Sequence, residues 1–414
     1  MTSSVDPQHR AAESRQPLLT RALLMRFVTV VGASASFFLL LSVVPMYAQS
    51  VPGRGSDEAG LVTGALMLAT VIGELMTPWL AARCGYRGTL GAGLLFLGAP
   101  ALALTVSQSM VWIVAVCLVR GLGFAFTVVA GGALTVSLIP PERRGEGLAL
   151  IGIMAGVPSL VGLPLGTWLA SHTGYGPVCA VAALLALVSI AAVLGLPDRE
   201  AARGAHLGVL AGARSGAIVR PTVVFAVTAL GAGIIVTFLP LAVASRYSGV
   251  VAAALFVQPA AATVSRWFAG RHGDRHGPAG LMLPGLLASA VGILVVAFTD
   301  VPVAVIVGVA VFGVGFGITQ NATITLMYSR VQASGYGTAS ALWNVAYDAG
   351  MGIGAVGFGA VAGLTGYPGA FVLTGALMLT ALVPAWSDRA AAGRHRATGA
   401  GDRSAPVGEE EKQG

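Results

Sequence analysis

Four ionisable side chains stand inside long stretches of this sequence that are otherwise apolar. They are Glu74, Arg120, Arg266 and Asp348. Placing a charge at the centre of a lipid bilayer costs at least about 2.5–3.5 kcal/mol on insertion scales, so each of these residues is a candidate for function. A carboxyl group shielded from water can bind and release a proton near neutral pH, and a nearby arginine can control that exchange. We therefore take Asp348, Glu74 and Arg120 as candidates for proton coupling.

Three of these charges also have a structural interpretation. Glu74 could be held by a partner where two helical bundles meet, and Arg120 could form a permanent ion pair that joins two helices. Arg266 lies near the end of its apolar stretch, which favours extension of its long side chain to the membrane surface. Both interpretations stay open for Glu74 and Arg120, whereas the structural one is favoured for Arg266.

Two polar stripes indicate helix faces that are turned toward protein or water. The first consists of Asn344, Tyr347, Asp348 and Met351. The second consists of Phe316, Gln320, Thr323 and Met327, with Asn321 beside it. Spacings of three, four and seven residues place each set on one face of a helix. The amides of Gln320 and Asn321 could hydrogen-bond a substrate or join two helices, and both interpretations are kept.

The composition indicates a membrane protein. Hydrophobic residues make up 56% of the 414 residues and charged residues 10%, whereas a soluble domain carries about 25% charged residues. Twelve apolar stretches are close to the roughly 20 residues that cross a hydrocarbon core. They are 27–48, 60–80, 88–107, 110–138, 147–170, 177–196, 221–243, 249–268, 279–299, 301–327, 337–363 and 369–386. Backbone groups in lipid must be hydrogen-bonded within the segment, so the predicted fold class is an all-α membrane protein.

The sequence contains a duplication with an offset of 192 residues. Arg83-Cys84-Gly85 returns as Arg275-His276-Gly277, and Thr173-Gly174-Tyr175 returns as Thr365-Gly366-Tyr367. Glu74 and Arg266 are also 192 positions apart, with opposite charge. A doubled intramembrane unit is the common architecture of secondary transporters.

The duplication divides the chain into five parts. We expect a cytoplasmic N-terminal segment (1–26), a first six-helix bundle (27–196), a cytoplasmic linker (197–220), a second six-helix bundle (221–387) and a disordered cytoplasmic tail (388–414). Apart from the two intramembrane arginines, only Arg54 and Arg246 fall on the side opposite the N-terminus, which predicts that both termini are cytoplasmic. A single lysine among many Ala, Gly and Arg residues indicates a GC-rich bacterial genome, and hence an inner membrane.

The segment that joins the second and third apolar stretches of each half carries a family motif. In the second half, Gly270-Arg271-His272-Gly273-Asp274-Arg275-His276-Gly277 fits the pattern G-x-x-x-D-R-x-G. Over essentially its whole length the chain resembles the major facilitator superfamily. The resemblance implies two six-helix bundles that rock about a central cavity lined by the first and fourth helices of each half.

The residues of this loop motif have distinct expected roles in gating. Gly277 permits a sharp turn, Arg275 can meet anionic headgroups or a helix C-terminus, and Asp274 suits a helix N-terminus or an arginine. The first copy keeps Arg83 and Gly85 but has Ala82 in place of the acid and Pro78 in place of the first glycine. A charge-based latch is therefore expected only in the second copy.

Two further passages resemble family motifs. Arg120-Gly121-Leu122-Gly123-Phe124 resembles the conserved-arginine motif that the family associates with proton coupling. Gly156-Val157-Pro158 followed by Gly162-Leu163-Pro164-Leu165-Gly166 resembles a loosened form of the antiporter motif G-x-x-x-G-P-x-x-G-G. Since drug exporters carry that motif more often than importers, it favours efflux.

The helices that the resemblance turns toward the cavity carry aromatic side chains. The cavity candidates are Phe37, Phe38, Tyr47, Phe124, Phe316, Gln320, Asn321, Asn344 and Tyr347. Such walls suit a moderately hydrophobic ligand, although each residue alone is more often ordinary packing. The candidate cavity residues include no ring of acids that would favour a polycationic substrate. They also include no pair of arginines that would favour an organic phosphate.

These observations predict a monomeric drug:proton antiporter that lies in the lipid bilayer and contributes to antibiotic resistance. It is expected to export a small organic compound, with the proton as coupling ion. No cofactor, metal, nucleic-acid partner or enzymatic activity is expected. One alternative is a proton-linked importer of a metabolite, and another is a transporter-like membrane sensor or scaffold. An intramembrane enzyme would need a nucleophile–base or metal cluster within the spans, and no histidine is expected at mid-span.

Overall fold

The structure is a computed structural model that describes residues 20–139, 144–197, 216–331, 336–383 and 386. All regular elements in these ranges are helices. Residues 1–19 of the predicted N-terminal segment, residues 198–215 of the predicted linker and the predicted tail lie outside the described residues.

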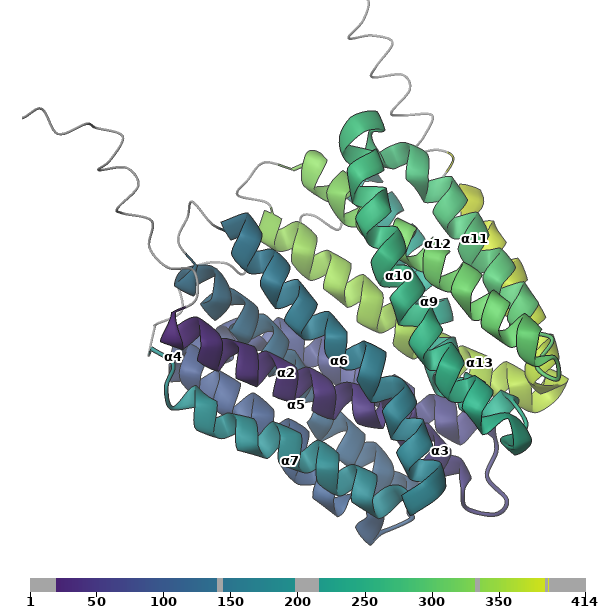
Figure 1. Ribbon diagram of the computed structural model, residues 1–414, viewed down its shortest axis with the longest axis horizontal. Coiled ribbons are helices and arrows are strands. Elements are labelled where there is room, and N and C mark those ends of the chain that lie inside the picture. The colour runs from purple at the N-terminus through teal and green to yellow at the C-terminus, as the bar shows by residue number, and fades with distance from the viewer. Residues whose placement is uncertain (1–19, 140–143, 198–215, 332–335, 384–385, 387–414) are drawn as a thin grey trace, which may run out of the picture. The chain divides into compact units, whose positions relative to one another are not determined.

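The helices follow one another along the chain as Figure 1 labels them. In the first half they are α2 (Arg21–Leu41), α3 (Val43–Gln49), α4 (Ser56–Ala103), η1 (Leu104–Val106), α5 (Met110–Leu138), α6 (Arg144–Thr173) and α7 (Tyr175–Val193). In the second half they are α9 (Gly216–Ala242), η3 (Ser245–Tyr247), α10 (Ser248–His276), η4 (Pro278–Leu281), α11 (Met282–Val296), α12 (Pro302–Ser329) and α13 (Tyr336–Thr380).

Local sequence signals account for several helix starts. The Thr20 hydroxyl accepts a hydrogen bond from the Leu23 amide at 3.2 Å and so caps α2. The Glu58 carboxylate accepts a hydrogen bond from the Gly55 amide at 2.7 Å at the start of α4. Pro302 occupies the first position of α12, where its missing N–H removes no helical hydrogen bond.

Nine stretches of the described residues are long and apolar enough to cross a membrane. Two of them are interrupted, because α4 has non-helical geometry at Gly85 and α13 at Gly366. Counting the two parts of α4 and of α13 separately, and adding α6, gives twelve helical segments among the described residues. This agrees with the twelve predicted stretches.

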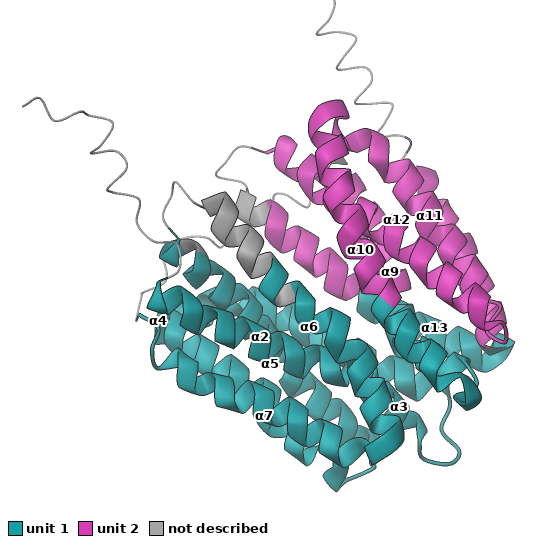
Figure 2. Cartoon of the chain, in the orientation of Figure 1, with its two compact units in different colours: residues 1–206, 233–256, 351–366 teal, residues 207–232, 257–350, 367–414 magenta. Residues whose placement is uncertain are grey.

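Contacts within the chain group its residues into two compact units, shown in Figure 2. Unit 1 contains residues 1–206, 233–256 and 351–366, and unit 2 contains residues 207–232, 257–350 and 367–414. Helices α9, α10 and α13 therefore each contribute residues to both units. This grouping describes packing, whereas the predicted bundles 27–196 and 221–387 describe the duplication of the chain.

Unit 1 has its own internal contacts between α4 and the parts of α9 and α13 that belong to it. The hydroxyl groups of Thr63 and Thr237 lie 2.9 Å apart. The Ser56 hydroxyl donates to the Gly359 carbonyl at 2.7 Å. Polar pairs of this kind join helices that would otherwise have only apolar surfaces to offer each other.

The 192-residue offset of the sequence also relates packing contacts inside the two units. In unit 1, a Cβ atom added to Gly121 would lie 2.2 Å from the Leu66 carbonyl oxygen. In unit 2, a Cβ atom added to Gly313 would lie 2.4 Å from the Gln258 carbonyl oxygen. Gly121 and Gly313 are 192 positions apart, and so are Leu66 and Gln258. The same close helix contact is therefore formed once in each unit.

The same offset relates four glycines with left-handed backbone geometry. Gly85 and Gly277 have φ angles of 69° and 88°, and Gly174 and Gly366 have φ angles of 82° and 72°. Each of them stands at a break between two helical segments. Glycine adopts this geometry without steric cost, so the repeated sequence produces the same turn in each half.

Candidate functional site

An aromatic cluster lies inside unit 2, where α9, α12 and α13 meet. The ring of Phe225 stacks on that of Trp343 with centroids 4.2 Å apart, and lies 5.9 Å from that of Tyr347. The ring of Phe316 lies 6.2 Å from both Phe225 and Tyr347. Rings at these separations stabilise one another beyond their burial alone. The cluster (Phe225, Phe316, Trp343 and Tyr347) therefore forms a firm apolar wall.

Asp348 follows the last member of this cluster directly in α13. Only 7% of its surface is exposed. Among the described residues, no cationic side chain forms an ion pair with it and no donor hydrogen-bonds to it. A buried carboxylate without a partner is costly, so this position favours the neutral, protonated form of the side chain.

Arg266 lies on α10 and is exposed in the described part of the chain. It is near enough to Tyr347 for an electrostatic interaction between the two side chains.

The predicted polar residues of α12 separate into two environments. Gln320 stands one helical turn after Phe316, and its Oε1 atom is buried without a hydrogen-bond partner among the described residues. The amide of Asn321 instead lies beside Gly270 of α10. Asn344 is half-buried on α13, one turn before the acid at position 348. Gln320 is thus the amide on the same face of α12 as Phe316 of the aromatic cluster.

The hydroxyl of Thr323 links α12 to the cluster. It accepts a hydrogen bond from the Trp343 indole at 3.2 Å and donates to the Thr319 carbonyl at 2.8 Å. Both polar atoms of this contact are therefore satisfied, and Trp343 is fixed in orientation.

Unit 1 contains a second buried charge, Arg120 of α5, of which 1% is exposed. Its Nε atom donates to the Leu97 carbonyl at 3.2 Å and an Nη atom donates to the Ser36 carbonyl at 3.1 Å. Its hydrogen-bond partners among the described residues are thus main-chain carbonyls of α4 and α2. Arg120 joins three helices, and its control of an acidic group remains a prediction.

Aromatic candidates of unit 1 lie beside that arginine's helix. Phe37 stacks on Phe124 with ring centroids 3.7 Å apart, and Phe38 meets Phe37 edge to face at 5.3 Å. Tyr47 belongs to a different place, because its ring packs against that of Tyr175 at 5.2 Å. The structure therefore groups three of the four predicted residues of this unit.

Arg26 is a buried residue of unit 1 that the sequence patterns do not single out. Its Nε atom donates to the Gly131 carbonyl at 3.0 Å and to the Thr135 hydroxyl at 3.1 Å, and Nη1 donates to the Thr29 hydroxyl at 2.9 Å. The sequence alone places it with the polar residues before the first span. Thr29, one turn further along α2, is the only local signal that it points into protein.

Glu74 is half-buried on α4. The preceding residue, Gly73, packs closely on Ala125 and Leu122 of α5, so this part of α4 lies against a neighbouring helix. This environment fits either of the roles predicted for Glu74.

The loop-motif residues lie where α4 and α10 end or break. The Arg83 guanidinium lies 4.4 Å from the ring centroid of Trp79, a cation–π distance. Asp274 and Arg275 are exposed in the last turn of α10. The Gly277 amide donates to the Gly273 carbonyl at 2.8 Å and so closes that helix.

Apolar helices long enough to cross a bilayer, with charged and aromatic side chains buried in the structure, define a multi-pass membrane protein. The chain belongs to the Major Facilitator Superfamily, whose profile matches residues 26–355 and, in a second alignment, residues 222–411. Since members of this family are secondary transporters, the chain is a secondary transporter that binds small molecules.

Relatives along most of the chain support this assignment. The "Uncharacterized MFS-type transporter YhhS" of Escherichia coli K12 is 24% identical over 374 residues, which cover 87% of this chain and 92% of that protein. The "Multidrug resistance protein MdtH" of Aeromonas hydrophila is 26% identical over 354 residues, covering 83% and 85%. A crystal structure of a mutant of the nucleoside transporter NupG superposes with a TM-score of 0.74 at 13% identity, covering 89% of this chain and 99% of that one. The last of these similarities establishes the fold alone.

Proposed function

We propose that the protein is a proton-coupled antiporter that exports a small, moderately hydrophobic organic compound across the bacterial inner membrane. The observation that carries the proposal is the burial of Asp348 against the aromatic cluster without an ionic partner among the described residues. An acid in this position can exist in two protonation states with very different solvation costs.

The coupling follows from that difference in cost. Protonated Asp348 is compatible with a dry, closed interior, whereas the ionised form needs water or a cation nearby. Proton binding therefore favours one conformation and proton release favours the other. A substrate that binds the two conformations with different affinities is then moved against its gradient by the proton gradient.

The substrate class follows from the surroundings of the acid. The half-buried rings of Trp343 and Tyr347, which stack on the buried ring of Phe225, offer flat apolar surfaces. The Oε1 atom of Gln320 offers one hydrogen-bond acceptor. A compound with an aromatic or alicyclic body and one donor group fits this combination.

Two observations favour export. The sequence of α6 carries glycines and prolines in an order similar to that of the antiporter motif, and Pro158 and Pro164 lie inside that helix. A relative from Aeromonas hydrophila carries the name of a multidrug resistance protein. Both support the outward direction of transport.

The proposal is tested by expression in a drug-sensitive bacterial host that is exposed to a panel of antibiotics, with and without a protonophore. We expect resistance to at least one apolar compound, abolished by the protonophore. Inverted membrane vesicles whose interior is more acidic than the medium should then accumulate that compound. Accumulation instead in right-side-out vesicles whose exterior is the more acidic side would identify an importer. Resistance that persists with the protonophore would exclude proton coupling.

A further inference from the structure

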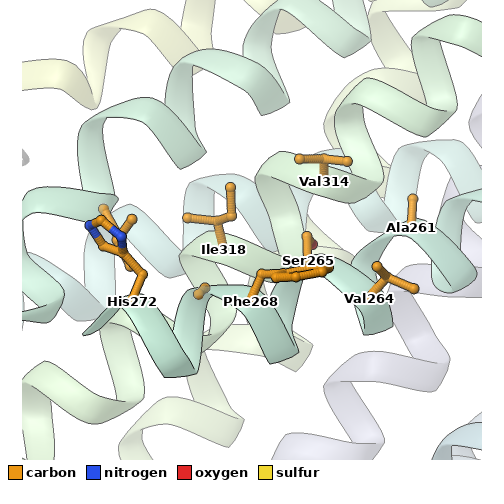
Figure 3. A pocket seen from close by; sticks show the side chains of 9 residues that line it. Ala261, Val264, Ser265, Phe268, His272, Val314 and Ile318 are labelled. Atoms are coloured by element: carbon orange, nitrogen blue, oxygen red, sulfur yellow. The ribbon is translucent and has the colours of Figure 1, made fainter. Parts of the chain in front are cut away.

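A groove lies on unit 2 between α10, α12 and η4, with a volume of about 430 Å³ (Figure 3). Of the nine residues that line it, seven are apolar and two, Ser265 and His272, are polar. The Ser265 hydroxyl donates to the Ala262 carbonyl at 3.2 Å and is thereby satisfied. The groove therefore offers an occupant an apolar surface along most of its length.

The groove is separate from the candidate transport site. Val314 and Ile318 line it and lie one turn apart on α12, and 40% of Val314 is exposed. Phe316, midway between them in sequence, belongs to the aromatic cluster with Phe225 and Tyr347. Successive helical residues are rotated by about 100°, so residues two apart point in nearly opposite directions. The groove thus lies on the side of α12 that faces away from the cluster.

One end of the groove carries ionisable groups. Figure 3 shows His272 at one end and Val264 and Ala261 at the other. The ring of His272 stacks on that of His276 with centroids 4.4 Å apart. Arg271 and Arg275 flank these histidines in the last turns of α10 and are exposed.

An aromatic residue accompanies this basic end. The Arg271 guanidinium lies 4.9 Å from the ring centroid of Trp267. Phe268, of which 58% is exposed, continues the apolar wall of the groove from there. Apolar wall, tryptophan and arginine follow one another along α10 in the order in which acyl chains, interface and headgroups follow one another in a membrane leaflet.

The duplication provides an internal comparison for this end of α10. The ionisable residues are Arg271, His272, Arg275 and His276, and their equivalents 192 positions earlier are Trp79, Leu80, Arg83 and Cys84. Three of the four positions are therefore basic only in the second copy. Shared ancestry of the helix ends does not account for this basic cluster, which points to a role particular to the second copy.

We propose that the groove binds an anionic phospholipid, with one acyl chain between α10 and α12 and the phosphate beside Arg271, His272 and Arg275. The apolar wall recognises the chain, and the basic cluster selects an anionic over a zwitterionic headgroup. Asp274 is the one acid in this turn, so Arg271 and Arg275 leave one positive charge in excess.

The test is fluorescence quenching in nanodiscs of phosphatidylcholine that contain small amounts of a lipid brominated on its acyl chains. The contribution of Trp267 is the difference between the natural protein and the Trp267→Phe variant. We expect half-maximal quenching at a mole fraction at least threefold lower for brominated phosphatidylglycerol than for brominated phosphatidylcholine. Equal quenching by the two lipids would overturn the proposal without any further variant.

Substitutions then locate the site. Arg271→Gln with Arg275→Gln should remove the preference for phosphatidylglycerol. Arg83→Gln with Arg87→Gln removes two arginines near Gly85, the equivalent of Gly277 in the first half, and should retain the preference. Val314→Phe fills the groove without adding a second tryptophan, and it should weaken quenching by both lipids. A preference that survives Arg271→Gln with Arg275→Gln in correctly folded protein, as judged by gel-filtration elution, would also reject the site.

Discussion

Phe225 of α9 and Trp343 of α13 stack face to face, with ring centroids 4.2 Å apart and an angle of 10° between the rings. This stack joins two helices that are more than a hundred residues apart in sequence. Tyr347 stands one turn after Trp343 on the same face of α13, and Asp348 follows it. The stack therefore helps to determine where the buried acid lies.

Replacing Phe225 by Leu should weaken substrate binding without unfolding the protein. Aromatic pairs contribute about 0.5–1.5 kcal/mol beyond their burial, so we expect the apparent affinity for an aromatic substrate to fall about two- to tenfold. The measurement is the concentration dependence of transport into vesicles. Phe371→Leu, at another fully buried position of unit 2, should leave the affinity unchanged. An equal loss in both variants would assign Phe225 to packing alone.

Replacing Asp348 by Asn should separate substrate movement from the proton gradient. The amide is uncharged in every state, so the conformational equilibrium no longer responds to protons. In proteoliposomes we expect gradient-driven accumulation to fall at least tenfold, while exchange of labelled for unlabelled substrate at equal pH continues. Asp300→Asn, an exposed acid in the loop before α12, is the control. Undiminished accumulation by Asp348→Asn would remove this residue from the coupling mechanism.

Replacing Arg120 by Gln should distinguish its two predicted roles. The variant loses hydrogen bonds from a charged donor to two carbonyls, which contribute about 1.5–3 kcal/mol each. We therefore expect a lower midpoint of thermal unfolding in detergent. If Arg120 only joins helices, the number of protons moved per substrate is unchanged in the protein that remains folded. A changed stoichiometry would instead support control of a titrating acid.

The part of the fold that the sequence predicts is the part that lipid dictates. Backbone hydrogen bonding in a bilayer converts each apolar stretch into a helix, and repeated glycines such as Gly85 and Gly277 show where turns recur. The sequence predicts the helices on either side of Gly366 as two separate spans. The structure also separates them at Gly366, with almost no loop between them.

Parts of the site could not be predicted in the same way, because they depend on contacts between distant residues. Phe225 stands in a long apolar run without a charged or amide side chain near it in sequence after Arg220. Trp343 could have been predicted as a site residue, since it precedes Tyr347 by one helical turn and shares its face. Arg26 is buried by a carbonyl and a hydroxyl of α5 that are more than a hundred residues away in sequence. Periodicity shows which face of a helix is buried but not which neighbour covers it.

A cross-link between Thr63 and Thr237 should stop transport. Their hydroxyl oxygens are 2.9 Å apart, so cysteines at both positions can approach the geometry of a disulfide. If α4 and this part of α9 separate during each transport cycle, oxidation of the double cysteine variant lowers the rate at least tenfold and a reducing agent restores it. The exposed Cys84 is first replaced by Ala, and each single cysteine variant serves as a control. Full activity in the oxidised protein would show that this contact stays closed throughout the cycle.

Gly121→Ala and Gly313→Ala should damage the protein to a similar extent, since the same contact is formed at both positions. The added methyl group would lie 2.2 Å and 2.4 Å from carbonyl oxygens of the facing helices, which forces those helices apart. Overpacking of this kind typically destabilises by about 1–3 kcal/mol. Gly132 lies on the same helix as Gly121, but a methyl group added there would meet no atom within 4 Å. The Gly132→Ala variant should therefore have the same unfolding temperature as the natural protein. Thermal unfolding in detergent and expression level measure all three. Because the two close contacts belong to different units, a large loss at one position and none at the other would show that only one copy of the duplicated contact limits stability.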